Sequence, residues 1–169
     1  AMPVVAAAAA VSAPVDLMVS GDALGRGFNR VYTKNFLATM RRKTLAKLAV
    51  FPAICNREHM LAATTLRDFD NLVTAPLHGY RNTDDYWTRA SAKPWLRHIL
   101  VPTLMVNARN DPFLPAQALP RAHELSSAVT VEFPATGGHV GFVTGSFPGR
   151  LDWLPRRLLN FFQDHTINE

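Results

Sequence analysis

An apolar run from Val101 to Val106, which ends in the polar turn Asn110-Asp111-Pro112, constrains the fold most. Short apolar runs bounded by turn residues are typical of buried strands, and Pro102 is tolerable as an initial strand residue. A second run, Val129 to Phe133, alternates apolar and polar side chains, which predicts a strand near the edge of a sheet with one wetter face. The loop from Thr136 to Phe142 follows it. Polar loops are therefore expected at the carboxyl ends of two neighbouring strands.

Asp111 and His139 occupy these two loops, and their side chains predict an acid–base pair. The glycines on either side of His139 let its loop take positive φ angles and approach a neighbour closely. A carboxylate that fixes the tautomer of an imidazole base needs only a nucleophile to complete a catalytic triad. Two alternatives stay open, because Asn110 competes for the turn role and His139 could bond only to backbone. Asp111 is preferred to Asn110 because only a carboxylate stabilises a developing imidazolium.

The run from Val4 to Ser12 predicts a third strand. It does not alternate, which suits a strand buried on both faces of a parallel sheet, and it ends at Ala13-Pro14. Its alanines favour helices, so periodicity alone leaves the assignment open. Asp16 follows this strand and is predicted to cap the next segment rather than to contact a substrate.

Residues 17–98 have a helical and irregular pattern without a strand signal. The pattern predicts helices at Val31–Met40, Thr44–Phe51, Glu58–Phe69 and Thr83–Ala92, and a loop at residues 74–80. Seven aromatic side chains of this segment are candidates for lining a substrate pocket, with ordinary packing as the simpler role for each: Phe28, Tyr32, Phe36, Phe69, Tyr80, Tyr86 and Trp87.

Two further helices are expected towards the C-terminus. The segment from Pro115 to Ser126 predicts a crossover helix, which Pro120 shortens or kinks. Asp152 predicts the N-cap of a final helix with Pro155 in its first turn. An apolar stripe on this helix is expected to pack on the sheet and consists of Leu154, Leu158, Phe161 and Phe162.

The segments NARNDPFLP (107–115) and GGHVGF (137–142), with VSAPVDL near the start, resemble the YheT-like branch of the α/β-hydrolases. The resemblance covers most of the chain. It implies an α/β fold in which residues 1–169 are the C-terminal part of one α/β-hydrolase domain, with about three parallel strands and flanking helices. It also implies that residues 17–98 are a helical cap insertion, and that Asp111 and His139 are the acid and base of a Ser-His-Asp triad.

The nucleophile of that family lies on a Gly-x-Ser-x-Gly elbow, and this sequence contains no such motif. Ser12, Ser20 and Ser146 are the serines near strand ends or glycines, but none has a strand–elbow–helix setting. We therefore expect the serine and most oxyanion-hole donors to lie upstream, in a missing N-terminal half of the fold, and the chain alone to be inactive. The expected substrates are carboxylic esters or acyl lipids. A non-catalytic binding module is the alternative, and a dehalogenase-like enzyme with an Asp nucleophile is a weaker one.

Charge and cysteine content exclude several other classes. The net charge is +5, but the basic residues are scattered, and their one cluster, Arg41-Arg42-Lys43 with Lys47, is predicted to be the solvated face of a helix rather than a nucleic-acid site. No histidine pair has metal-ligand spacing and no glycine-rich phosphate loop follows a strand, so we expect neither metal nor cofactor. Cys55, the single cysteine, fits a reducing, cytoplasmic location and is interpreted as a partly buried thiol. The longest apolar stretch, Pro3 to Val11, is too short to span a membrane.

Overall fold

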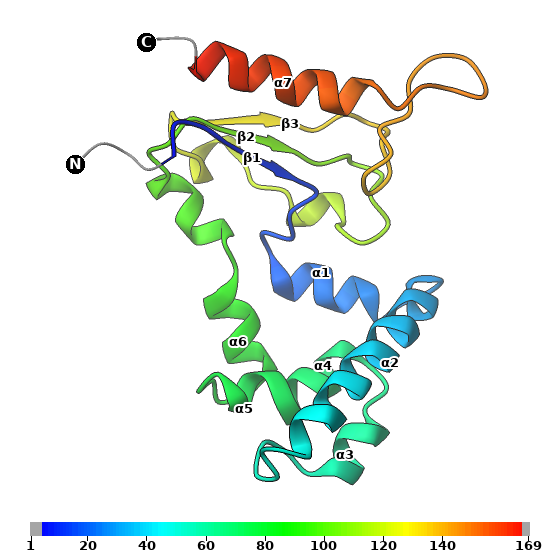
Figure 1. Cartoon of the computed structure of the whole chain (residues 1–169). Coiled ribbons are helices and arrows are strands. Elements are labelled where there is room, and N and C mark those ends of the chain that lie inside the picture. The colour runs from blue at the N-terminus through cyan, green and yellow to red at the C-terminus, as the bar shows by residue number, and fades with distance from the viewer. Residues whose placement is uncertain (1–4, 167–169) are drawn as a thin grey trace. The chain divides into compact units, whose positions relative to one another are not determined.

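The computed structural model describes residues 5–166, which form two compact units (Figure 1). Residues 5–15 and 92–166 make up the sheet unit, and residues 16–91 make up the helical unit. Within the segment 17–98 that the sequence predicts as a cap, residues 92–98 belong to the sheet unit, where the Lys93 amide donates to the carbonyl of Val15 at 2.9 Å. A cap role for the helical unit remains a prediction.

Three parallel strands form the sheet, as predicted. They are β1 (Ala8–Val11), β2 (Thr103–Val106) and β3 (Val129–Glu132), in the spatial order β1-β2-β3. Val11, Val106 and Glu132 lie in register at their carboxyl ends. Every residue of the central strand β2 is buried, because the apolar run of the sequence is covered on both faces. The loops that follow the three strands therefore emerge at one edge of the sheet.

The first strand is shorter than the predicted Val4–Ser12. Val4 lies outside the described residues, and the strand ends at Val11, one residue before Ser12. Ser12 still donates its amide to the Val106 carbonyl at 2.8 Å, but its φ of 49° turns the chain out of the sheet. A left-handed backbone is uncommon for a residue other than glycine, so the end of β1 is defined by conformation and not by the apolar pattern.

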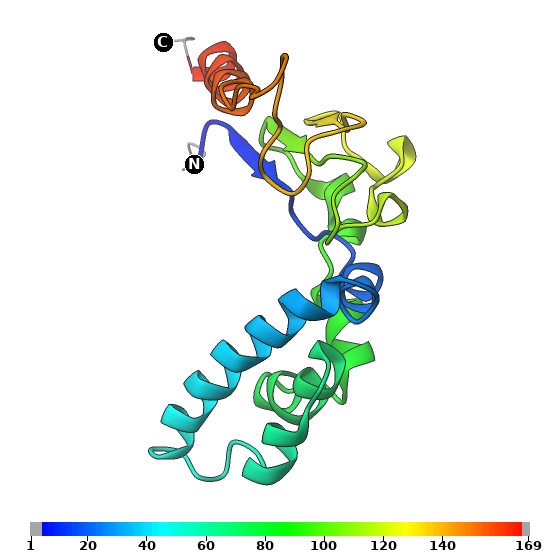
Figure 2. The same ribbon diagram turned by 90° about the vertical axis from the view of Figure 1, so that its right-hand side faces the viewer.

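The final helix α7 (Trp153–Thr166) lies beside the sheet (Figures 1 and 2). Its apolar stripe packs against the sheet, as predicted. The helix begins directly after Asp152, so Pro155 lies in its first turn, where the missing N–H leaves no bond unmade. Phe161 is buried among Leu104 and Val106 of β2. Burial of this stripe fixes the helix along one face of the sheet.

The predicted crossover helix from Pro115 to Ser126 is wrong. The segment contains two single 3₁₀ turns, Ala116–Ala118 and Ala122–Glu124. Between them Leu119 is extended, with a ψ of 140°. Pro120 disfavours the helical conformation of the residue before it and supplies no amide hydrogen, so the helix cannot continue through it.

The helical unit begins with α1 (Leu17–Leu24), which Asp16 caps as predicted by accepting a hydrogen bond from the Val19 amide. The next helix, α2 (Asn29–Leu48), corrects the prediction of two helices at Val31–Met40 and Thr44–Phe51. It is continuous because neither glycine nor proline occurs within it, and the Arg41-Arg42-Lys43 cluster between the predicted halves consists of good helix formers.

The third predicted helix, Glu58–Phe69, is two helices, α3 (Arg57–Ala62) and α4 (Leu66–Phe69). A new N-cap separates them: Thr65 and Asp68 form a capping box, with each side chain bonded to the other's backbone amide. The chain then continues helically through a π-helical turn, Asp70–Thr74, and α5 (Ala75–Leu77), so part of the predicted loop 74–80 is helical. The last helix of the unit is α6 (Thr83–Ala90), two residues shorter than predicted.

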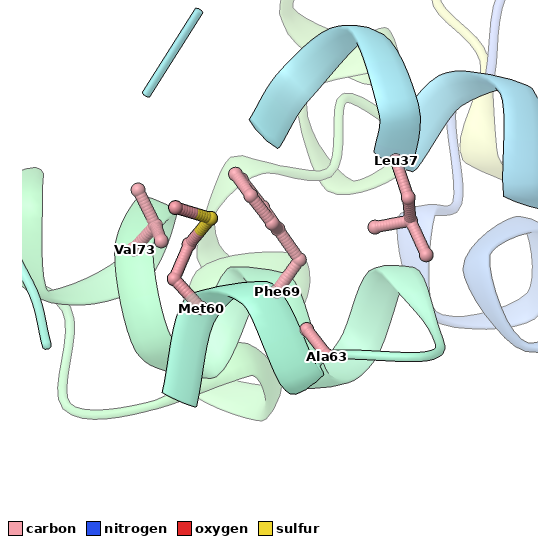
Figure 3. Packing of buried hydrophobic residues seen from close by; sticks show 5 residues of the cluster. All are labelled: Leu37, Met60, Ala63, Phe69 and Val73. Carbon is pink, nitrogen blue, oxygen red and sulfur yellow. The ribbon is translucent and has the colours of Figure 1, made fainter. Parts of the chain in front are cut away.

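The core of the helical unit consists of buried residues from α2, α3 and its C-cap, α4 and the π-helical turn (Figure 3), namely Leu37, Met60, Ala63, Phe69 and Val73. Phe69 and Trp87, two of the candidate pocket aromatics, are buried in this unit, and the Trp87 indole donates to the Asp70 carboxylate at 2.8 Å. Their observed role is packing. Phe28, Tyr32 and Phe36 are instead exposed along α2.

Candidate active site

Asp111 lies in the turn that follows β2, and its side chain has no exposed area. Its Oδ1 accepts hydrogen bonds from the amides of Phe113 (2.8 Å) and Leu114 (3.2 Å). These bonds replace the hydrogen bonds to water that this oxygen loses on burial. They are needed because burying a charge is costly unless it is hydrogen-bonded. They also fix the plane of the carboxylate and aim Oδ2 at the neighbouring loop.

Two glycines shape the loop that follows β3. A Cβ atom on Gly137 would lie 2.6 Å from the ring of Phe142 and 2.8 Å from the Cβ of Ala108, so only glycine fits there. Gly138 has a φ of 61°, and its amide donates to Oδ1 of Asn110 at 3.0 Å. The loop is thus held against the turn that carries Asp111. Asn110 therefore joins the two loops, whereas the local bonds of the turn and the contact with His139 are both made by Asp111.

His139 and Asp111 form the predicted pair, with His139 Nδ1 lying 2.8 Å from Asp111 Oδ2. A carboxylate can only accept, so the neutral imidazole that fits this contact carries its proton on Nδ1. The imidazole is 39% exposed, and no residue in the described part of the chain hydrogen-bonds to its Nε2. Phe113 packs edge-on against the ring, with 4.9 Å between the centroids. The arrangement leaves a basic nitrogen directed away from a buried acid.

Ser12 adds a contact that sequence reasoning missed. Its hydroxyl donates to the backbone carbonyl of His139, and the residue is buried. Since Ser12 follows β1, Asp111 follows β2 and His139 follows β3, all three strand ends meet at this site. In the sequence, Ser12 is distinguished only by its position at a strand end, and nothing there predicts the partner of its hydroxyl. Ser20 lies in α1 of the helical unit, and Ser146 is exposed.

The remaining reactive groups do not assemble into a second centre. Within residues 5–166, no three His, Cys, Asp or Glu side chains gather in a way that could hold a metal ion. Cys55 is half-buried, and burial raises the pKa of its thiol, which makes the nucleophilic thiolate scarcer at neutral pH. Over the same residues, no helix is long and apolar enough to cross a membrane.

Comparison with known proteins places this sequence in a family. The model of the family described as the alpha/beta hydrolase fold matches residues 24–146, a segment that includes both Asp111 and His139. The chain belongs to the α/β-hydrolase family. Within this family it is YheT-like, because it is 36% identical over 154 residues to YheT of Escherichia coli (strain K12), a protein named as an esterase. It is also 30% identical over 159 residues to Phospholipase ABHD3 of Mus musculus.

These matches cover nearly all of the α/β-hydrolase chain but only part of its relatives. They include 90% of the chain and 45% of YheT, and 93% of the chain and 39% of the mouse phospholipase. The human Monoacylglycerol lipase ABHD2 is 33% identical over a shorter segment, 60% of the chain and 25% of that protein. The chain therefore spans less than half the length of these curated relatives. No solved structure matches it.

Proposed function

We propose that this chain carries the acid and base of a serine hydrolase that cleaves carboxylic esters or acyl lipids. The observation that carries the proposal is the 2.8 Å contact between a buried carboxylate and an imidazole whose Nε2 has no partner in the described residues. The nucleophilic serine would come from a segment that precedes this sequence. The names of the relatives, an esterase and two lipid hydrolases, support the substrate class. We further propose that the helical unit is the cap of this enzyme.

In the proposed mechanism Nε2 of His139 removes the proton from the serine hydroxyl as its oxygen attacks the ester carbonyl carbon. The imidazolium that forms is stabilised by Asp111, which stays ionised. The tetrahedral intermediate collapses as His139 donates its proton to the departing alkoxide, so the alcohol leaves and an acyl-serine remains. His139 next removes a proton from water, which attacks the acyl-serine. Transfer of that proton to the serine oxygen releases the carboxylic acid.

Labelling with a fluorophosphonate probe tests the proposal on the protein at its natural length. One serine outside this sequence should be labelled, and the same protein should hydrolyse a p-nitrophenyl ester. His139→Ala should abolish both labelling and turnover, because an unactivated serine hydroxyl is a weak nucleophile. His123→Ala is the matched control, since His123 is an exposed histidine of the same unit and should leave both unchanged. Labelling that persists in His139→Ala would refute the role of His139 as base.

A further inference from the structure

The helical unit contains a cavity of about 500 Å³ between α2 and the turn that joins α3 to α4. Three basic side chains of α2 line it, Arg30, Lys34 and Arg41, and they face Thr64 and Thr65 of the turn. No Asp or Glu is among the residues that line it. Three positive charges on one wall with no acid beside them make the cavity electropositive.

Arg41 is the least compensated of these cations. Its Nη2 donates to the backbone carbonyl of Ala63, but its Nε is buried and has no hydrogen-bond acceptor within residues 5–166. In the same residues no carboxylate forms an ion pair with Arg30, Lys34 or Arg41. A partly buried charge without a counter-charge is unfavourable, and an unmade hydrogen bond on the same group adds to the cost. An anion in the cavity would supply the missing counter-charge.

Asp68, which follows Thr65 by three residues, is already committed to the turn. Its Oδ2 accepts from the amides of Thr64 (3.1 Å) and Thr65 (2.9 Å) and from the Thr64 hydroxyl (3.2 Å). Burial by itself raises the pKa of this carboxyl, but the hydrogen bonds from Thr65 and Thr64 outweigh burial and lower it. Asp68 thus stays ionised, holds the wall of the cavity in place and does not occupy it.

We propose that this cavity binds a phosphate group. Arg30, Lys34 and Arg41 lie on one side of α2 and line the same cavity, so this side of the helix offers charge-assisted hydrogen bonds to phosphate oxygens. Val31 and Leu37 also line the cavity, so it accepts an apolar substituent on that phosphate. Leu37 belongs at the same time to the core cluster of Figure 3, which anchors this part of α2. The site lies wholly within the helical unit, and its binding does not depend on hydrolytic activity.

The test measures binding in the His139→Ala background at the natural length of the protein, so that turnover cannot interfere. Inorganic phosphate is titrated by calorimetry, and vesicles of phosphatidylcholine with or without one-fifth phosphatidic acid are tested by co-sedimentation. Arg41→Met should weaken phosphate binding at least tenfold. Arg30→Met with Lys34→Met should do the same, and because both side chains are exposed this double variant keeps the proposal testable if Arg41→Met fails to fold.

Arg42→Met with Lys43→Met is the matched control, since it removes two charges from the same helix at residues that do not line the cavity. It should change the dissociation constant less than twofold. Saturable binding of free phosphate alone supports the site and assigns it to a soluble phosphate. If the protein also binds phosphatidic acid vesicles and Arg41→Met abolishes that binding, the site is assigned to a lipid head group. Absence of phosphate binding at 10 mM, or an equal loss in the control, overturns the proposal.

Discussion

In the tautomer that fits this contact, Nδ1 of His139 donates to one oxygen atom, Oδ2 of Asp111, and 2.8 Å separates the nitrogen from the oxygen. Asp111→Asn puts an amide in place of the carboxylate. An amide nitrogen at the position of Oδ2 donates a hydrogen bond to Nδ1 and so favours the tautomer with its proton on Nε2. That tautomer cannot act as the base. We expect kcat for a p-nitrophenyl ester to fall by about 10⁴-fold, with the fold retained. Asp164→Asn, an exposed change on α7, is the control and should have no effect. Near-normal turnover in Asp111→Asn would contradict the assignment.

The hydroxyl of Ser12 allows a second test of the site, because it donates a hydrogen bond to the backbone carbonyl of His139. Ser12→Ala and Ser12→Gly both remove that bond, but only glycine also relieves the left-handed φ of 49°. If the hydroxyl positions the imidazole, both variants should lower kcat about tenfold with little change in KM, whatever their thermal stability. Full activity in Ser12→Gly would reduce Ser12 to a structural residue. The measurement is steady-state ester hydrolysis beside a thermal unfolding curve.

These residues show what a sequence can reveal of such a site. Asp111 and His139 were predictable as neighbours because each follows a strand, and parallel strands end at one edge. The bond from Ser12 was not predictable, because it joins residues 127 positions apart and depends on one unusual backbone angle. Apolar patterns predict strands, but they do not predict which hydroxyl donates a hydrogen bond to which carbonyl.

At the scale of elements, the apolar pattern predicted the strands and α7 but not the bounds of the other helices. The strands were predictable because their apolar runs are short and bounded, and α7 because its stripe is regular. The crossover helix failed at Pro120, and α2 was divided wrongly although nothing in it breaks a helix. The high helix propensity of the Arg41-Arg42-Lys43 cluster was a better guide than the apolar pattern, since a polar stretch interrupts that pattern but not the helix.

The loop after β3 gives a prediction that rests on packing. Gly137→Ala adds a Cβ that would lie 2.6 Å from the Phe142 ring and 2.8 Å from Ala108, so neighbours must shift. We expect a loss of about 1–3 kcal/mol in the free energy of unfolding, measured in urea, and a weaker His139–Asp111 contact. Gly141→Ala is the matched control, because its nearest neighbour is 3.5 Å away. Equal stability of the two variants would show that the loop is not tightly packed.

The capping box of α4 gives a prediction in pH. The pKa of Asp68 is lowered in the folded protein, because hydrogen bonds from Thr65 and Thr64 outweigh burial. A lowered pKa means that the carboxylate stabilises the fold above its unfolded pKa and that this stability is lost as pH falls through the folded value. Asp68→Ala should therefore cost about 1 kcal/mol at pH 7. The difference from wild type should shrink towards pH 2 in urea titrations. A penalty of the same size at both pH values would point to lost packing instead.

At the scale of the whole molecule, the outer edge of β1 matters most. Among the described strands β1 pairs only with β2, and its four residues carry no charge. An unpaired, uncharged edge is a template for association, and natural proteins protect such edges with lysine, proline or another strand. We infer that in the natural protein another strand of the sheet covers this edge. We therefore expect residues 1–169 alone to be oligomeric or aggregated, and co-expression with the preceding part of the protein to restore a monomeric complex.

Adding a single charge to β1 tests whether association is caused by pairing at this edge or by a general loss of stability. Ala9 and Val11 of β1 pack in one cluster with residues of α7, and Ala10 lies on the opposite face of the strand. Ala10→Lys therefore adds a charge to the edge strand without placing it in that cluster. If edge pairing drives association, Ala10→Lys should raise the monomer fraction in light scattering several-fold. Thr88→Lys adds the same charge at an exposed position of α6 and should leave the fraction unchanged. A sharp monomer peak for the unmodified chain, with cooperative unfolding at high temperature, would instead mean that these residues fold independently and that β1 needs no covering strand.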